Sequence, residues 1–403
     1  MTPALQRERL LTPQFILIAS SGALYFLSLG TGIPVIPRYV TGPLGGGDLA
    51  VGIAIGSFTI GAVLLRPYTG RLGDRVGRRV LVIGGAFVVA IATALTLVAD
   101  TTEMLVAVRF FGGLGEAAFF VGAATMITDL APAERRGEAI SYWSVAVYSG
   151  LAFGPVIGET VYDAAGFDAV WITGAALAFA AALLALATRE TKHPGQSPAK
   201  TPLLHRSALG PGSILFLGLI GLTGFVAFVP LYVVDIGWKD SRGVFLLYGL
   251  LIMVIRIAGA RLPDRLGPLR AGTLALGSVA AGLLIMAGWE SVAGLMIGTV
   301  VFAVGMAFMY PALMTLALYG VNDNERAAVV GTFSSFFDIS QGLGALIVGT
   351  IAELSGFRGA FLGGAVFAIS GLVLLRSGID PRIRARHEEV RAFAEIPESE
   401  PGT

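Results

Sequence analysis

The sequence predicts an all-α polytopic membrane protein with 12 transmembrane helices in two pseudo-symmetric six-helix bundles. Three observations predict this fold class. Apolar residues make up 55% of the 403 residues and charged residues only 14%, which is more apolar surface than one soluble core buries. The apolar residues form runs of about 20, the length that an α-helix needs to cross a bilayer. A charged motif that begins near Arg66 returns near Arg256 in the second half of the chain, which indicates an internal duplication.

The expected spans are the long apolar runs of the chain. Barrel strands would need only about 10 residues of alternating polarity, whereas these runs are longer and do not alternate. The first run has no small-residue cleavage site before a soluble chain, so we expect it to be a retained helix. The twelve spans are residues 14–36, 49–70, 79–99, 104–128, 138–162, 168–188, 213–236, 243–262, 270–289, 292–317, 327–352 and 357–376.

One connection is much longer than the others, residues 189–212, and it is rich in Pro, Lys and His. We therefore expect an N-terminal six-helix bundle (1–188), a cytoplasmic central loop (189–212), a C-terminal six-helix bundle (213–379) and a cytoplasmic tail (380–403). With both termini inside, 21 Lys and Arg residues fall in inner segments and 4 in outer loops. This bias predicts cytoplasmic termini by the positive-inside rule.

Several classes of function are disfavoured by what the sequence lacks. The net charge is +1, so the chain has no overall attraction to nucleic acid. It has no cysteine, and its three histidines lie outside the apolar runs. No phosphate-binding loop, zinc-protease motif or serine-nucleophile elbow occurs. We expect no enzyme activity, no cofactor and no metal, and a monomer whose partners are a small-molecule substrate, protons and the lipid bilayer.

The charged motif GRLGDRVGRR (70–79) follows the second span, and its copy follows the second span of the other half. Parallel repeats with a site at their interface are typical of secondary transporters, which expose that site alternately to each side by rocking one half against the other. Six of twelve positions are identical between the copies: Arg66 and Arg256, Arg71 and Arg261, Leu72 and Leu262, Asp74 and Asp264, Arg75 and Arg265, and Gly77 and Gly267.

Three motifs carry a resemblance to a known family. GRLGDRVGRR resembles the signature between helices 2 and 3 of the major facilitator superfamily. RFFGGLGEAAFF (109–120) resembles that family's helix 4 motif, which is built on an intramembrane arginine and glycines. GLAFGPVIG (150–158), with Gly154, Pro155 and Gly158, resembles the helix 5 motif of its proton-driven antiporters, although Glu159 stands where that motif usually has a second glycine. The chain thus resembles the proton-coupled drug antiporter branch.

The resemblance implies roles for two of these motifs. The helix 5 motif would seal the central cavity against proton leak. The charged motif would form an inner cluster that latches the outward-open state. The residues of this conformational latch are Gly70, Asp74, Arg75, Gly77, Arg78 and Asp129 in the first half, and Asp264, Arg265 and Gly267 in the second.

Arg109 and Glu116 are charged residues inside the fourth span. A charge near the bilayer centre costs about 2.5–3.5 kcal/mol on insertion scales, so such a residue normally faces the bundle interior and has a function. Seven residues separate the two, which places them on one helix face. We expect Glu116 to carry a proton with a pKa tuned by Arg109; the alternative is a buried pair that only fixes packing.

Asp338 lies near the middle of the eleventh span, in TFSSFFDISQG. A weaker echo between ERRGEAIS (134–141) and ERAAVVGT (325–332) matches Asp338 with Val147. The duplicated scaffold therefore does not require a carboxylate there, which favours a functional role in gating or carrying protons. Gln341, one turn away, could hydrogen-bond the substrate or Asp338.

Other polar residues have simpler interpretations. We expect Arg66 and Arg256 to snorkel or pair at the inner interface, and Glu159 to be hydrated at the outer end of its helix. Aromatic side chains on the expected cavity helices would form an adaptable apolar pocket suited to varied ligands. The aromatic candidates are Tyr25, Phe119, Phe120, Trp143, Tyr148, Phe225, Phe228 and Tyr310.

Together these features favour a proton-coupled exporter of amphipathic or hydrophobic small molecules in a bacterial cytoplasmic membrane. Transport of a polar metabolite, such as a sugar or siderophore, and flipping of a lipid-linked substrate are alternatives. From another class, the chain could be a membrane receptor or scaffold that does not transport. The costly charges inside the spans argue against that last reading, because a disused site need not keep them.

Overall fold

The structure, a computed structural model, describes residues 10–132, 135–191, 204–258, 266–319, 321 and 326–379. In the first half of the chain the helices are α1 (Pro13–Gly32), α2 (Val35–Thr41), α3 (Asp48–Val76), α4 (Arg78–Leu95) with the short turn η1 (Thr96–Val98), α5 (Thr102–Asp129) and α6 (Arg136–Leu186). In the second half they are α7 (Arg206–Asp235), α8 (Arg242–Ala258), α10 (Pro268–Gly288), α11 (Val292–Ala317), α12 (Arg326–Leu374) and the final turn η4 (Leu375–Ile379).

The helices provide the twelve expected spans. Within the described residues, nine helices are long and apolar enough to cross a membrane. Two of them contain two spans each, because α6 and α12 run for 51 and 49 residues and are interrupted at Gly166 and Gly356. Both glycines have a positive φ (77° and 69°), a conformation that other residues rarely adopt. The 17-residue α8 completes the set, and the polytopic all-α prediction is confirmed.

The backbone repeats the duplication that the sequence indicated. Two helices at equivalent places in the halves, α5 and α11, are capped alike, since Thr101 Oγ1 accepts from Met104 N and Ser291 Oγ accepts from Gly294 N. Every residue with positive φ in the described part of the chain has a partner in the other half: Gly45 and Gly237, Gly77 and Gly267, and Gly166 and Gly356. The two halves therefore have the same turns at equivalent places.

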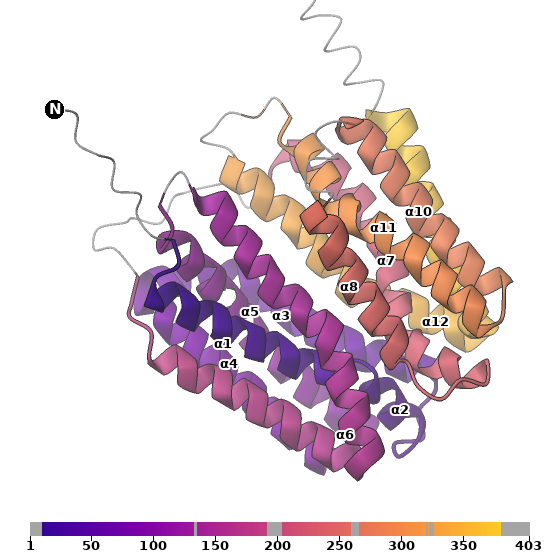
Figure 1. Cartoon of the computed structure of the whole chain (residues 1–403), viewed down its shortest axis with the longest axis horizontal. Coiled ribbons are helices and arrows are strands. Elements are labelled where there is room, and N and C mark those ends of the chain that lie inside the picture. Colours follow the sequence, from indigo (N-terminus) through magenta and orange to yellow (C-terminus); the bar gives the residue numbers. More distant parts are fainter. Residues whose placement is uncertain are drawn as a thin grey trace, which may run out of the picture.

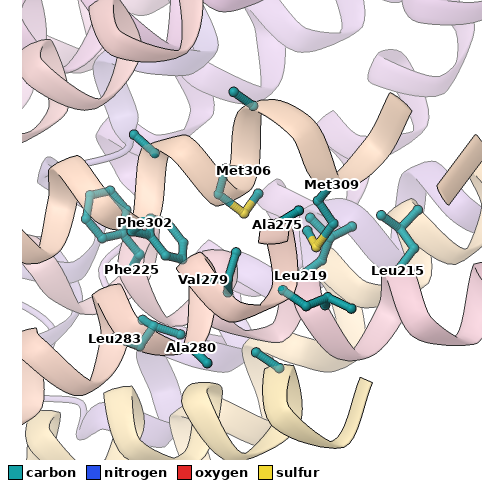
Figure 2. Packing of buried hydrophobic residues seen from close by; sticks show 14 of the residues in the cluster. Leu215, Leu219, Phe225, Ala275, Val279, Ala280, Leu283, Phe302, Met306 and Met309 are labelled. Carbon is teal, nitrogen blue, oxygen red and sulfur yellow. The ribbon is translucent and has the colours of Figure 1, made fainter. Parts of the chain in front are cut away.

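Figure 1 shows the two halves side by side, α1 to α6 in indigo to magenta and α7 to α12 in rose to yellow. Each has its own buried core. In the first half the core includes Phe15, Tyr25 and Phe119. In the second half, α7, α10 and α11 interdigitate through Leu219, Val279 and Met309 (Figure 2). Each half thus packs as a bundle, although the exact bundle boundaries stay predictions.

The two ends of the helix bundles are formed by different connections. The motif end is where Gly77 joins α3 to α4 and where Gly267 precedes α10. The far end is where residues 42–47 join α2 to α3 and residues 236–241 join α7 to α8. A third hydrophobic cluster, near the far end, contains residues of both halves, such as Trp171 of α6 and Phe228 of α7. The halves are therefore in contact at the far end.

Close backbone approach holds the halves together along α3 with α12 and α6 with α8. A Cβ added at Gly52 would lie 2.4 Å from the carbonyl oxygen of Ala345, and one at Gly249 would lie 2.3 Å from the Cβ of Ala152. Small residues permit such contacts between membrane helices. The interface is thus built from residues far apart in sequence.

The first expected span differs from the structure. The first span, expected to run unbroken over 14–36, divides into α1 and α2, and Pro34 is the residue before α2. Proline has no N–H to donate and clashes with the preceding turn, so it interrupts a helix. The predicted tail (380–403) and residues 192–203 of the predicted central loop lie outside the described residues. The end of that predicted loop, residues 206–212, is helical and belongs to α7.

A charge cluster between the two halves

Arg66 joins two carboxylates that come from different halves. Its Nη2 donates to both carboxylate oxygens of Glu116 on α5, at 3.1 Å each. Its Nη1 forms an ion pair with Oδ2 of Asp338 on α12. The Arg66–Asp338 contact crosses from the first half to the second. We call Arg66, Glu116 and Asp338 the central ion cluster.

The central ion cluster is buried and has unequal charge. Glu116 is 8% exposed and Asp338 is 5% exposed. One guanidinium serves two carboxylates, so the fully ionised cluster has a net charge of −1. Two unit charges 4 Å apart interact by about 4 kcal/mol in a protein, against about 1 kcal/mol in water. One added proton would make the cluster neutral.

The structure changes the expected role of Arg66. We expected it to snorkel or pair at the inner interface, but it binds both of the carboxylates that the sequence singled out, which sequence reasoning missed. The sequence contained a signal for this role of Arg66. The arginine occurs in both halves, whereas Glu116 and Asp338 have no carboxylate counterparts. Its copy Arg256 lies over the ring of Tyr148, with its Cζ 4.4 Å from the ring centroid.

The counterpart of Asp338 is also corrected. The weaker sequence echo matched it with Val147, but the paired positive-φ glycines Gly166 and Gly356 set a register that differs by one position. Asp338 precedes Gly356 by as many positions as Tyr148 precedes Gly166, so Asp338 corresponds to Tyr148. The equivalent position still has no carboxylate, and the asymmetry between the halves remains.

Arg109 and Glu116 do not form the pair that the spacing suggested. Seven residues extend about 10.5 Å along a helix, and Glu116 pairs with Arg66 instead. Arg109 Nε donates to the carbonyl oxygen of Ala54 at 3.2 Å, and its guanidinium lies 4.7 Å from the Phe58 ring centroid. Arg109 lines a pocket inside the first half, together with Trp171. This pocket is separate from the central ion cluster.

Some of the predicted aromatic residues lie beside the charges. The ring centroid of Phe120 is 5.0 Å from Arg66 Cζ. Tyr25 stacks on Phe119, with 3.7 Å between the ring centroids. The hydroxyl of Tyr310 lies 3.0 Å from Oγ of Ser334, which is one turn before Asp338 on α12.

The other predicted cavity residues have no hydrogen bond or ion pair with the central ion cluster among the described residues. Trp143 packs against Phe26 and Phe120 in the first-half core. Phe225 stacks on Phe302 at 5.1 Å within the second-half core. Phe228 lies in the far-end cluster beside Phe357. These three side chains stabilise packing. Gln341, one turn from Asp338, has a buried Nε2 without a hydrogen-bond partner in the described structure.

The predicted latch is only partly described. Arg78 forms an ion pair with Asp129. The backbone N–H groups of Arg78 and Arg79 donate to the carboxylate of Glu190, at 3.0 and 3.1 Å. Glu190, which sequence reasoning missed, thereby satisfies the free N–H groups at the start of α4. These contacts join the start of α4 to the end of α5 and to residue 190, which follows α6.

The remaining latch residues are placed less fully. Gly77 ends α3 with a φ of 103°, and Arg75 is exposed in the last turn of that helix. Gly70 and Asp74 lie in α3, and the Asp74 side chain is outside the described part. Gly267 precedes α10. Asp264 and Arg265 lie outside the described residues.

The helix 5 motif packs on α1. An added Cβ at Gly154 would lie 2.5 Å from the Cα of Gly30, and one at Gly158 would lie 2.1 Å from the carbonyl oxygen of Thr31. Pro155 lies between them inside α6. Glycine at these positions permits the close α1–α6 contact.

Glu159 was expected to be hydrated, and that prediction is wrong, since the residue is 0% exposed. Its Oε1 accepts from Ser241 N at 3.0 Å and from Ser241 Oγ at 2.5 Å, and its Oε2 accepts from Arg242 N at 2.9 Å. Arg38 Nη2 also contacts it at 3.1 Å. Glu159 is buried because it satisfies the first N–H groups of α8 across the interface.

Solved structures share this architecture. The human organic anion transporter MFSD10 aligns with a TM-score of 0.70 and 19% identity, over 90% of this chain and 98% of that one. The nucleoside transporter NupG aligns with a TM-score of 0.71 and 16% identity, over 91% and 98%. At these identities the likeness concerns the fold.

Sequence relatives cover nearly the whole chain. An uncharacterized MFS-type transporter of Salmonella typhimurium is 29% identical over 373 residues, which are 89% of this chain and 94% of that protein. One of Pseudomonas aeruginosa is 28% identical over 380 residues, which are 90% and 92%. The family model described as Major Facilitator Superfamily matches residues 18–331 and also 279–399. The chain therefore belongs to the major facilitator superfamily.

Proposed function

We propose that this protein is a proton-coupled exporter of amphipathic small molecules that works by alternating access. The observation that carries the proposal is the ion pair between Arg66 and Asp338, which ties the two halves together beside a second carboxylate, Glu116. In a transporter that rocks one half against the other, the driving ion must make or break a contact between the halves. The Arg66–Asp338 ion pair is a contact of this kind. Membership of a transporter family argues against enzyme activity.

Protonation of Asp338 is the proposed switch. It removes the negative charge of Asp338 and therefore the ion pair across the halves, while the ion pair between Arg66 and Glu116 remains. The neutral cluster leaves the halves free to move, and loss of the proton on the other side restores the tie. One proton crossing 100 mV supplies about 2.3 kcal/mol, so a membrane gradient is a sufficient source of energy.

The sidedness follows from the distribution of basic residues. We place the motif end in the cytoplasm of a bacterium, with both termini on that side of the cytoplasmic membrane and the protein working as a monomer. In this orientation the far-end contacts of Glu159 with Ser241 and Arg242 close the outer side. The outer side of the interface must open when solute is released.

The solute is proposed to be amphipathic because charged and aromatic groups lie together at the interface. Phe120 is beside Arg66, and Tyr148 is beside Arg256. Aromatic rings bind apolar surface, and their faces also attract cations. A solute with an apolar body and a polar group would use both kinds of contact.

Accumulation assays on inside-out membrane vesicles test this proposal. Vesicles that contain wild type, Glu116→Gln or Asp338→Asn are energised and given a panel of amphipathic dyes, with and without a protonophore. We expect protonophore-sensitive uptake by wild type and at least a tenfold loss in both variants. Glu103→Gln is the matched control, since Glu103 is an exposed carboxylate in the first turn of α5.

One result would contradict the whole proposal, and another would contradict the assigned role of the two carboxylates. Equal accumulation in vesicles with and without the protein, across the whole panel, would exclude efflux. Full protonophore-sensitive uptake by both variants would leave the exporter proposal standing and remove the carboxylates from proton coupling.

A further inference from the structure

Each residue of the central ion cluster has a counterpart in the other half, in the register that pairs Gly166 with Gly356. The counterparts form a second site that is related to the first by the pseudo-symmetry of the halves. The pairs are Arg66 and Arg256, Glu116 and Met306, Phe120 and Tyr310, and Asp338 and Tyr148.

The contacts are repeated as well as the positions. Arg66 of the first half meets Asp338 of the second half, and Arg256 of the second half meets Tyr148 of the first. The second site therefore repeats the arginine contact across the two halves that the central ion cluster has.

The two sites differ in their charge. At the second site both carboxylates are absent, because Met306 and Tyr148 stand in their places. Among the described residues Arg256 has no ion pair, and its Nε is buried without a hydrogen-bond partner. An arginine inside the membrane normally pairs with a carboxylate or backbone carbonyls. A contact with the Tyr148 ring offsets only part of that cost.

We propose that Arg256, Tyr148, Met306 and Tyr310 form a subsite that binds the acidic group of the transported solute, which is then an amphipathic organic anion. The guanidinium can hold a carboxylate or sulfonate with two parallel hydrogen bonds. The thioether and the two aromatic rings offer apolar contact for the body of the solute. This inference rests on the proposed transport function and names its substrate class.

Binding of two dyes with one scaffold and opposite charge tests the proposal. Fluorescein is an anionic xanthene dye, and rhodamine 123 is a cationic one of similar size. Their fluorescence anisotropy is measured with purified full-length protein in lipid nanodiscs. We expect wild type to bind fluorescein, Arg256→Gln to weaken this binding at least tenfold, and Arg256→Lys to retain most of it. Rhodamine 123 binding is expected to be the same in all three.

A second variant tests the pseudo-symmetry directly. Met306→Glu places a carboxylate where the central ion cluster has Glu116. This internal carboxylate should pair with Arg256 and compete with the dye, so fluorescein binding is expected to be lost while rhodamine 123 binding is kept. The melting temperature of the variant is measured beside that of wild type, and equal values separate competition from misfolding.

The outcomes separate this proposal from the transport function. Absence of fluorescein binding by wild type, or unchanged fluorescein binding by Arg256→Gln, overturns the subsite, even if rhodamine 123 is exported with a proton. Fluorescein binding that depends on Arg256, without proton-coupled movement of the dye in proteoliposomes, supports the subsite and contradicts the proposed function.

Discussion

Glu159 of α6 accepts hydrogen bonds from both the backbone N–H and the hydroxyl of Ser241, which belongs to the opposite half of the chain. The same carboxylate accepts from Arg242 N, the first residue of α8. A helix N-terminus favours a negative charge. Glu159 thus joins the two halves at the far end by capping a helix of the opposite half.

Glu159→Gln is expected to loosen this closure. Loss of the charge weakens hydrogen bonds that contribute about 1.5–3 kcal/mol each when charged. Since about 1.4 kcal/mol is a factor of ten, the N–H groups of Ser241 and Arg242 should exchange with deuterium about ten to a hundred times faster. Hydrogen-exchange mass spectrometry of the peptide over 236–245 measures this. Glu103→Gln, at the same end, should leave that peptide unchanged.

Arg66→Gln is expected to destabilise the protein by about 3–5 kcal/mol, because it leaves two buried carboxylates without a cation. The triple variant Arg66→Gln, Glu116→Gln, Asp338→Asn removes all three charges and should recover most of that stability. Thermal unfolding in detergent measures both. Equal destabilisation by the single and triple variants would show that packing, not charge, is responsible.

Gly113→Ala is expected to destabilise the first half. Its added Cβ would lie 1.8 Å from the carbonyl oxygen of Phe58, so α3 and α5 would have to separate. Gly84→Ala on α4 is the matched control, since its Cβ would meet nothing within 4 Å. Alanine there should be neutral or stabilising by up to about 1 kcal/mol. Thermal unfolding of both variants tests the contrast.

Much of the architecture could be predicted from the sequence, because hydropathy is visible in each short segment and the duplication is visible when two short segments are compared. The spans, the long central connection and the repeat around Asp74 and Asp264 each appear in a short window of sequence. Glu116 and Asp338 could be selected in the same way, as carboxylates inside apolar runs, since such residues are costly in a membrane.

The partners of those residues could not be predicted. Helical spacing suggested Arg109 for Glu116, but Arg66 lies on another helix and reaches both carboxylates. From the sequence, Glu159 was expected to be hydrated at a position where the helix 5 motif usually has glycine. Its burial is explained by the position of α8, whose first N–H groups it binds.

By itself, therefore, the sequence determined the polytopic fold, the twofold repeat and the residues that carry charge into the membrane. Tertiary structure alone decided that Arg66 binds both carboxylates and that Arg256, its duplicate, has none among the described residues. The physical reason is that the hydropathy of a segment depends only on its own residues, whereas an ion pair depends on which helices pack against each other. Here the decisive meeting is between α3 of one half and α12 of the other.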